Sequence, residues 1–274
     1  MAGEVVEERE RDRRHRGAGR LVLTAAIAGL AALAASLPGL AAPPFPAARA
    51  MQHLVELCAL GPRVPGTPAH AAARAYLRET LEGAGVLVEE QRFEALLPRF
   101  AAPVVLTNVI GRVAPELRPR VVLGAHWDSR PWADQDPDPS RHQEPVLGAN
   151  DSASGCAILL ALAGMCAARP PAVGVDLVFF DGEDAGLADS LESFCVGSRE
   201  FARRLVEPPA YAIVLDMVGD RDLRIVPEMH GVRGAPDIQR YVWERARFLA
   251  IDAFADGPPI MLYDDHVPLL EAGV

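Results

Sequence analysis

Several clusters of acidic residues, one with a histidine, follow apolar runs in this chain, and residues of these types can bind a metal ion. Four clusters each follow an apolar run, and a fifth opens an apolar segment that is typical of a helix. One such cluster alone is often a solvated turn or a helix cap, but five predict a common site. Carboxylates that crowd together repel one another unless a cation or protons intervene. Because His, Asp and Glu suit zinc, the sequence predicts a zinc site. The clusters are residues 126–128, 148–151, 181–184, 216 and 264–266.

The residue types divide this chemistry between metal ligands and a base. Asp151 and Asp184 offer carboxylate oxygens to one zinc ion, and His126 offers an imidazole nitrogen to a second. Glu183 directly precedes a predicted ligand, so its side chain is expected to point away from the metal. It is therefore the predicted general base. Asp216 is predicted either to bind a second metal or to hydrogen-bond the substrate.

Other histidines and the cysteines add little to this site. Asp128, two residues beyond His126, is predicted to hold the imidazole ring through a hydrogen bond. The four cysteines form no CxxC pair, which argues against a zinc site made of cysteines and against a disulfide scaffold. The remaining histidines outside the clusters are predicted to lie at the surface or in loops: His15, His53, His70, His142 and His230.

The predicted ligands need a scaffold that brings strand ends to one edge. Apolar runs that are typical of strands alternate with segments that have helical spacing, which predicts an α/β fold. We expect a mixed, mostly parallel central sheet with helices on both faces, and ligands bind beyond the carboxyl ends of such strands. Strands are predicted at 86–93, 104–113, 121–126, 173–180, 211–217, 223–226 and 260–262, and helices at 47–60, 68–83, 153–168, 198–205 and 238–250, with a final helical turn.

The charge balance and the N-terminal residues limit where the protein acts. The chain has 37 acidic and 27 basic residues, a net charge of −10, which argues against sequence-independent binding of nucleic acid. Residues 21–42 carry no charge and follow four arginines, so residues 1–42 are predicted to be a basic flank plus a signal peptide or signal anchor. We therefore expect residues 43–274 to form a catalytic domain outside the cytoplasm: periplasmic, secreted or membrane-anchored. This N-terminal segment is the only predicted contact with a membrane.

Five motifs resemble the zinc-dependent aminopeptidase superfamily that includes the glutaminyl-peptide cyclotransferases. The resemblance runs from about residue 47 to residue 274. Twelve residues separate Asp184 from Gly197, a spacing similar to that of the animal cyclases, whereas classical aminopeptidases have a much shorter link. The motifs are GPRVPGTPAH at 61–70, HWDSRPWAD at 126–134, GAND at 148–151, FFDGED at 179–184 and DDHVP at 264–268.

The resemblance implies a reaction and a role for each acid. It implies that an N-terminal Gln of a peptide or protein is converted to pyroglutamate with release of ammonia. Asp151 and Asp184, with one His, are the implied zinc ligands, and Glu183 is the implied proton shuttle. Asp216 and Asp264 complete the acid network. In two-zinc relatives the residues at His126 and Asp216 would hold the second ion. Two alternatives remain: a zinc-dependent aminopeptidase and a non-catalytic binding ectodomain.

The sequence departs from the animal cyclases at four places. Asp184 stands where they carry Glu, and Asp189 stands where they carry an aromatic residue. Ala125 stands where they carry a Cys, so their disulfide to the position of Cys156 is not expected here. The terminal zinc-binding His of the family lies beyond the position of Val274, so the resemblance implies that the catalytic domain lacks its C-terminal end. His266 does not align with that ligand.

Overall fold

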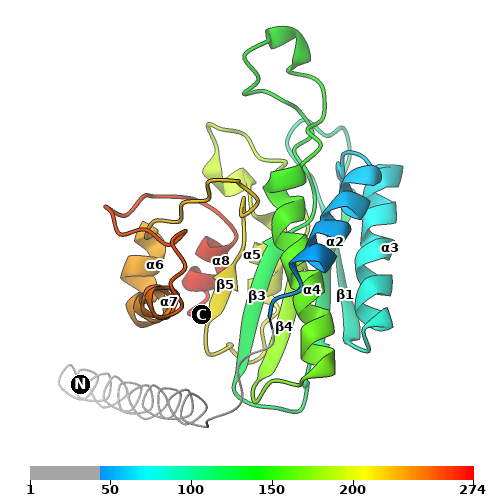
Figure 1. Cartoon of the computed structure of the whole chain (residues 1–274). Helices are drawn as coiled ribbons and strands as arrows, with labels where there is room; N and C mark the ends of the chain where they lie inside the picture. Colours follow the sequence, from blue (N-terminus) through cyan, green and yellow to red (C-terminus); the bar gives the residue numbers. More distant parts are fainter. Residues whose placement is uncertain (1–43) are drawn as a thin grey trace, which may run out of the picture. The chain divides into compact units, whose positions relative to one another are not determined.

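A computed structural model of the chain describes residues 44–274, so the predicted signal segment, residues 1–42, lies outside the described residues. Five strands form one mixed sheet with helices on both faces, which confirms the predicted fold class (Figure 1). The strands are β1 (Leu87–Ala95), β2 (Val104–Val113), β3 (Arg120–His126), β4 (Gly174–Phe180) and β5 (Ala212–Val214). The α-helices are α2 (Ala47–Ala59), α3 (Pro68–Gly83), α4 (Gly155–Ala168), α5 (Val196–Arg203), α6 (Met229–Gly234), α7 (Pro236–Phe248) and α8 (His266–Glu271). The short helical segments are η1 (Pro139–Arg141), η2 (Ala149–Ser154) and η3 (Leu191–Ser193).

The strand order places three carboxyl ends at one edge of the sheet. The order is β1-β2-β4-β3-β5, and β3 runs parallel to both β4 and β5. The register pairs His126 with Phe180, and Gly124 with Val214. β3, β4 and β5 therefore end together, as the position of the predicted site requires.

Alternation along β4 divides the core between the two faces of the sheet. Leu177 and Phe179 pack on the side of α2, α3 and α4, whereas Val178 and Phe180 pack toward α5 and α8. Both faces are covered, so all seven residues of β4 are buried, and its sequence is a nearly continuous apolar run. Asp176 is the acidic exception, and Arg120 pairs with it at the amino ends of the parallel strands.

Helix α3 begins where the sequence predicts. The side chain of Thr67 accepts a hydrogen bond from the backbone N–H of His70, and Pro68 occupies the first helical position. Both residues favour a helix start, since the cap satisfies a free N–H and proline has none to satisfy.

One helical segment among the described residues has the length and hydropathy of a membrane span. It is residues Ala149–Ala168, that is η2 with α4, and 56% of its most apolar window is buried. α4 packs against α2, β2, β3 and β4, so its apolar surface faces the protein core.

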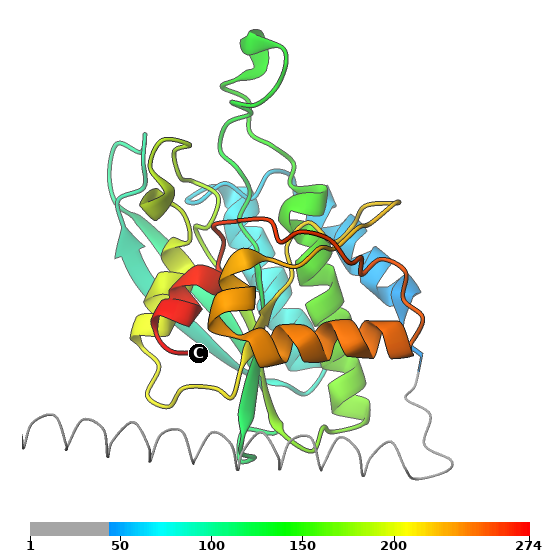
Figure 2. The ribbon, with the colours of Figure 1, turned by 90° about the vertical axis from the view of Figure 1, so that its left-hand side faces the viewer.

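The region after β5 differs from the predicted strands. β5 covers three residues of the predicted strand 211–217. The segments 223–226 and 260–262 do not join the sheet: Ile225 bridges Phe254, and Ile260 bridges Glu228. These two predictions were wrong. A short apolar run that forms a single bridge with a nearby segment has the same sequence pattern as a strand of the sheet. Figure 2 shows this region, α6 to α8, from the side of β5.

The segment between β3 and η2 projects beyond the carboxyl edge of the sheet, with η1 at its tip (Figures 1 and 2). Its two arms are joined at the base, where Val146 N donates to Arg130 O over 3.0 Å. Higher up, Ala133 N donates to Glu144 O over 2.8 Å. This projecting segment connects two of the predicted metal-binding clusters.

Candidate metal centre

Three predicted site residues converge at the carboxyl edge of the sheet. Nε2 of His126 lies 2.8 Å from Oδ1 of Asp151 and 3.6 Å from Oδ1 of Asp216. One ligand atom from each of the three lies within 4.8 Å of the other two. His126 ends β3, Asp151 lies in η2, and Asp216 follows β5 by two residues. Three separate chain segments therefore supply one cluster.

The polar atoms of this cluster fit a divalent metal ion. Nε2 of His126 and the Oδ1 atoms of Asp151 and Asp216 are buried, and none makes a hydrogen bond with acceptable geometry to the described residues. Buried polar atoms normally have partners, so three such atoms aimed at one point need a cation or protons between them. One nitrogen and two carboxylate oxygens suit zinc, and three protein ligands leave a fourth position open.

The surroundings of His126 favour a positive charge. Burial alone lowers the pKa of His126, but the neighbouring carboxylates of Asp128, Asp151 and Asp216 outweigh it and raise this pKa well above its usual value. Nδ1 of His126 lies 3.3 Å from Oδ1 of Asp128, the contact expected from their spacing. A proton held on Nδ1 leaves Nε2 free to bind a metal.

Asp128 also fixes the backbone that carries the predicted base. It is fully buried, and its two oxygens accept the backbone N–H groups of Glu183 over 3.0 Å and of Asp184 over 3.1 Å. One carboxylate therefore orients the imidazole that follows β3 and the turn that follows β4. The parallel pairing of these two strands makes this contact possible.

Glu183 is buried beside the cluster. Burial raises its pKa well above the usual value, and the nearby carboxyl of Asp265 adds to the effect. The Sγ atom of Cys195 donates to its Oε1 over 3.3 Å, and Cys195 N donates to its backbone carbonyl over 3.2 Å. The residues before α5 thus fold back onto Glu183.

Asp184 lies in the same turn and interacts with an arginine. Nη1 of Arg130 donates to Oδ1 of Asp184 over 3.0 Å and to its backbone carbonyl over 3.1 Å. Arg130 is itself held by both carboxylate oxygens of Asp134, each over 2.8 Å. Burial and the nearby Asp151 raise the pKa of Asp184 to about 7.

Asp264 approaches the cluster from a segment outside the sheet. Burial and the nearby Asp216 raise the pKa of Asp264 to about 7. This segment is held by Glu228, which accepts from Leu262 N over 3.3 Å and lies 3.1 Å from Nε2 of His266. His266 is therefore engaged by Glu228.

Two histidines predicted to lie at the surface are buried, so that prediction was wrong for His53 and His70. The exposed fractions of these residues are 2% and 6%. His70 stacks on Trp127 with ring centroids 4.2 Å apart, and its Nε2 lies 2.8 Å from Oδ1 of Asp181. His70 follows its helix N-cap by three residues and faces the sheet. The helical spacing of this histidine was the only signal in the sequence for its burial.

Arg63, like His70, lies near the site, and the spacing of residues in the sequence did not reveal its role. It is 1% exposed, and its guanidinium donates to the carbonyls of Trp127, Leu147 and Gly148 over 2.8, 2.9 and 2.7 Å. Every residue has a backbone carbonyl, so residue types do not predict which carbonyls accept hydrogen bonds from Arg63. The only signal was the position of Arg63 within the GPRVPGTPAH motif.

All four cysteines are free, and Cys156 therefore lacks a disulfide, as the alanine at position 125 predicts. Cys156 is buried, and its Sγ donates to the backbone carbonyl of His126 over 3.0 Å. A thiol hydrogen bond therefore lies where the animal cyclases are expected to have a disulfide.

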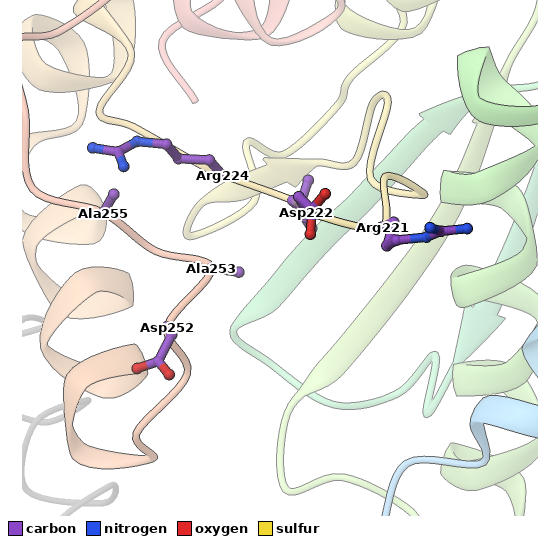
Figure 3. A pocket seen from close by; sticks show the side chains of 7 residues that line it. Arg221, Asp222, Arg224, Asp252, Ala253 and Ala255 are labelled. Carbon is purple, nitrogen blue, oxygen red and sulfur yellow. The ribbon is translucent and has the colours of Figure 1, made fainter.

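A shallow cavity of about 430 Å³ lies between residues 221–224 and 252–255. Figure 3 shows that the side chains of Arg221 and Arg224 point away from each other, and that Asp252 lies apart from both. Charged side chains that diverge do not form a site for one ligand, so the His126 cluster remains the candidate centre.

Comparison with known proteins agrees with this geometry. Residues 108–274 match peptidase family M28. The chain is 31% identical to the glutaminyl-peptide cyclotransferase of Boiga irregularis over 77% of this chain and 66% of that protein. It spans about two thirds or less of the length of the curated relatives it matches.

Solved structures show the same fold. A leucine aminopeptidase precursor from Bacteroides thetaiotaomicron is 34% identical, with a TM-score of 0.82 over 85% of this chain and 84% of that one. Glutaminyl cyclase from Porphyromonas gingivalis is 36% identical, with a TM-score of 0.78 over 84% of this chain and 81% of that one. The chain therefore belongs to peptidase family M28, as a member that resembles glutaminyl cyclases.

Proposed function

We propose that this protein is a zinc-dependent glutaminyl-peptide cyclotransferase, which converts an N-terminal Gln of a peptide or protein to pyroglutamate and releases ammonia. The observation that carries the proposal is the buried carboxylate of Glu183, which lies beside the His126 cluster under a long link that folds back onto it. Similarity to glutaminyl cyclases at 31–36% identity supports it.

The chain offers ligands for zinc at the carboxyl edge of the sheet. Asp151 belongs to both proposed ligand sets, the one with His126 and the one with Asp184. Its Oδ1 lies 2.8 Å from Nε2 of His126, and its charge raises the pKa of Asp184. His126, Asp151 and Asp184 would hold the metal, with Asp216 as a further ligand or hydrogen-bond partner. Zinc would supply Lewis acidity toward the γ-carbonyl oxygen of the substrate glutamine.

Glu183 moves the proton in the proposed reaction. The α-amine of the substrate attacks its own γ-carbonyl carbon, so a carbon–nitrogen bond forms within one residue. Glu183 takes a proton from the attacking amine and gives it to the leaving amide nitrogen, which departs as ammonia. A pKa raised by burial suits a group that must both accept and return a proton. Attack within one residue supplies much of the proximity advantage.

Asp264 and Asp216 complete the proposed acid network. Asp264 belongs to the segment that Glu228 holds, and Asp216 follows β5 by two residues. A protonated Asp264 can donate a hydrogen bond to the substrate, and a pKa of about 7 makes this form available. Asp216 would hydrogen-bond the amide nitrogen where it does not bind a metal.

The link between Asp184 and Gly197 supports selectivity for glutamine. Its central part is held by its own contacts: Leu187 N donates to Ser193 Oγ over 2.8 Å. Its end is held to the protein, because the Arg130 guanidinium lies 5.7 Å from the Phe194 ring centroid. A fixed link beside the base would wall the pocket against larger first residues.

One observation favours a second function, a zinc-dependent aminopeptidase. His126, Asp151 and Asp216 form a complete three-residue group, which suits a second zinc ion in addition to the one shared by Asp151 and Asp184. In that reaction Glu183 would accept a proton from a water molecule, which then attacks the first peptide bond.

Export from the cytoplasm is part of the proposal. The arginine-flanked apolar residues 21–42 support translocation as a signal peptide or anchor. The substrates would then be the N-termini of exported peptides or proteins.

Release of ammonia tests the proposed reaction. The zinc-loaded chain should release ammonia from a Gln-initiated peptide and form one pyroglutamyl peptide for each ammonia. A Leu-initiated peptide of otherwise identical sequence is the control and should stay unchanged. Equal turnover of both peptides by hydrolysis would contradict the cyclase assignment and favour the aminopeptidase.

A further inference from the structure

Arg63 is a buried cation whose guanidinium hydrogen bonds, among the described residues, all end on backbone carbonyls. Burying a charge costs free energy unless hydrogen bonds and nearby opposite charges offset the lost hydration. Carbonyl acceptors satisfy the N–H groups but leave the charge itself without an ion pair. Packing alone does not explain a buried arginine at position 63, because burying its charge costs free energy.

The three carbonyls belong to the two segments that carry the metal ligands. Trp127, whose carbonyl accepts from Nε of Arg63, directly follows His126. Gly148, whose carbonyl accepts from Nη2, precedes Asp151 by three residues. The planar guanidinium therefore joins the end of β3 to the loop before η2, at the base of the projecting segment.

The backbone of Arg63 strengthens the same connection. Its N–H donates to Oγ of Ser129 over 2.9 Å, and its carbonyl accepts from Ser129 N over 3.3 Å. Both the main chain and the side chain of Arg63 thus hold the residues that follow His126.

Gly148 is shaped to receive this guanidinium. Its φ is +68°, a left-handed conformation that favours glycine. A Cβ atom there would lie 2.6 Å from Nη2 of Arg63 and 2.5 Å from the carbonyl oxygen of Asp151. The close approach of Arg63 and the backbone path to Asp151 therefore depend on the same glycine.

We propose that Arg63 is a positioning residue for the metal centre, which fixes the separation of His126 and Asp151 so that both reach one zinc ion. The inference rests on the metal centre of the proposed function and does not depend on which reaction that centre performs.

Arg63→Lys tests this role, because lysine keeps the charge and loses the planar fork that reaches three carbonyls. Zinc affinity of the 274-residue chain, measured by equilibrium dialysis, should fall by about 10–100-fold, the range typical of residues that orient metal ligands. Arg120→Lys is the matched control. Arg120 is also largely buried and donates to Ala114 O and Val175 O, but it lies at the opposite end of β3. Its replacement should leave zinc affinity unchanged.

A purely structural role would lower the stability of both arginine variants and change zinc affinity in neither. The added readout is the rise in Tm on addition of zinc, which should shrink in Arg63→Lys and stay at the wild-type value in Arg120→Lys. Unchanged zinc affinity in a folded Arg63→Lys protein overturns the proposal.

Gly148→Ala provides a second test if Arg63→Lys does not fold. Alanine would displace the carbonyl that Arg63 holds, so zinc affinity should again fall by about 10–100-fold. Gly164→Ala is its control, since a Cβ at this helical glycine meets nothing within 4 Å. Zinc affinity equal in both glycine variants overturns the proposal. Failure of the wild-type chain to cyclise glutamine would contradict the proposed reaction and leave these affinity differences intact.

Discussion

The Nε2 atom of His126 and the Oδ1 atom of Asp151 lie 2.8 Å apart, although the two residues are separated by the whole projecting segment. Their contact joins the end of a central strand to the start of the helical segment that leads into α4. Asp216 reaches the same point from the next parallel strand. The candidate metal centre thus depends on strand order, because β5 lies next to β3 and brings Asp216 to His126.

Asp128→Asn should weaken zinc binding without removing a ligand. The amide keeps one acceptor oxygen, and its NH₂ group must face at least one of the three donors, which are the backbone N–H groups of Glu183 and Asp184 and the His126 ring. The turn and the ring can therefore no longer both be satisfied. We expect zinc affinity to fall by about 10–100-fold in a dialysis measurement. Asp138→Asn, an exposed acid that caps Ser140, serves as control and should bind zinc like the wild type. Unaltered affinity in Asp128→Asn would show that Asp128 does not orient the ligand.

Glu183→Gln should abolish most activity and keep the metal. Glutamine has nearly the same size but cannot take a proton from the attacking amine, so kcat should fall by about 10²–10⁴-fold. Zinc content, measured by atomic emission, should match the wild type because Glu183 is not a proposed ligand. Loss of zinc together with activity would mean that Glu183 and Asp184 have exchanged roles.

Shortening the link should change selectivity more than metal binding. Residues 187–193 are held largely by contacts within themselves, whereas Cys195 and Val196 bond to the turn that carries Glu183. Removing residues from 187–193 should therefore spare the base and open the pocket. The expected result is loss of preference for Gln-initiated over Leu-initiated peptides, with zinc affinity retained. Retained preference would show that the link does not set selectivity.

Leu177→Ala should destabilise the whole domain. Leu177 is fully buried in the middle of β4 and packs among residues of α3 and α4. Truncation leaves a cavity, and the free energy of unfolding should fall by about 2–5 kcal/mol in a urea titration. Val206→Ala, at a position that is 96% exposed, should have little effect. Similar losses in both variants would contradict the assignment of β4 to the core.

Much of the fold could be predicted because its local signals agree with its tertiary contacts. β2 matches its predicted range, and α3 begins at the predicted cap, since Thr67 and Pro68 act on their own backbone. The segment 260–262 was wrongly predicted as a strand, because apolar spacing does not reveal whether the partner is the sheet or a local bridge.

The acids of the site were visible in the sequence because four of their clusters follow an apolar run and the fifth, with Asp151, opens one. Their grouping was not, because it depends on strand order: Asp216 lies beside His126 only since β5 is next to β3. The supporting residues were less visible still. Arg63 acts through backbone carbonyls, and His70 through an aromatic stack and Asp181, contacts that residue spacing does not encode.

In the proposed reaction the attacking group is the α-amine of the substrate and not water. Incubation of the zinc-loaded chain with a Gln-initiated peptide in ¹⁸O-labelled water distinguishes the two by mass spectrometry. We expect a product lighter by about 17 Da, the mass of ammonia, with no ¹⁸O incorporated, because the attack is intramolecular. A shortened peptide and free glutamine heavier by about 2 Da, from one solvent oxygen, would contradict the cyclase assignment and establish hydrolysis.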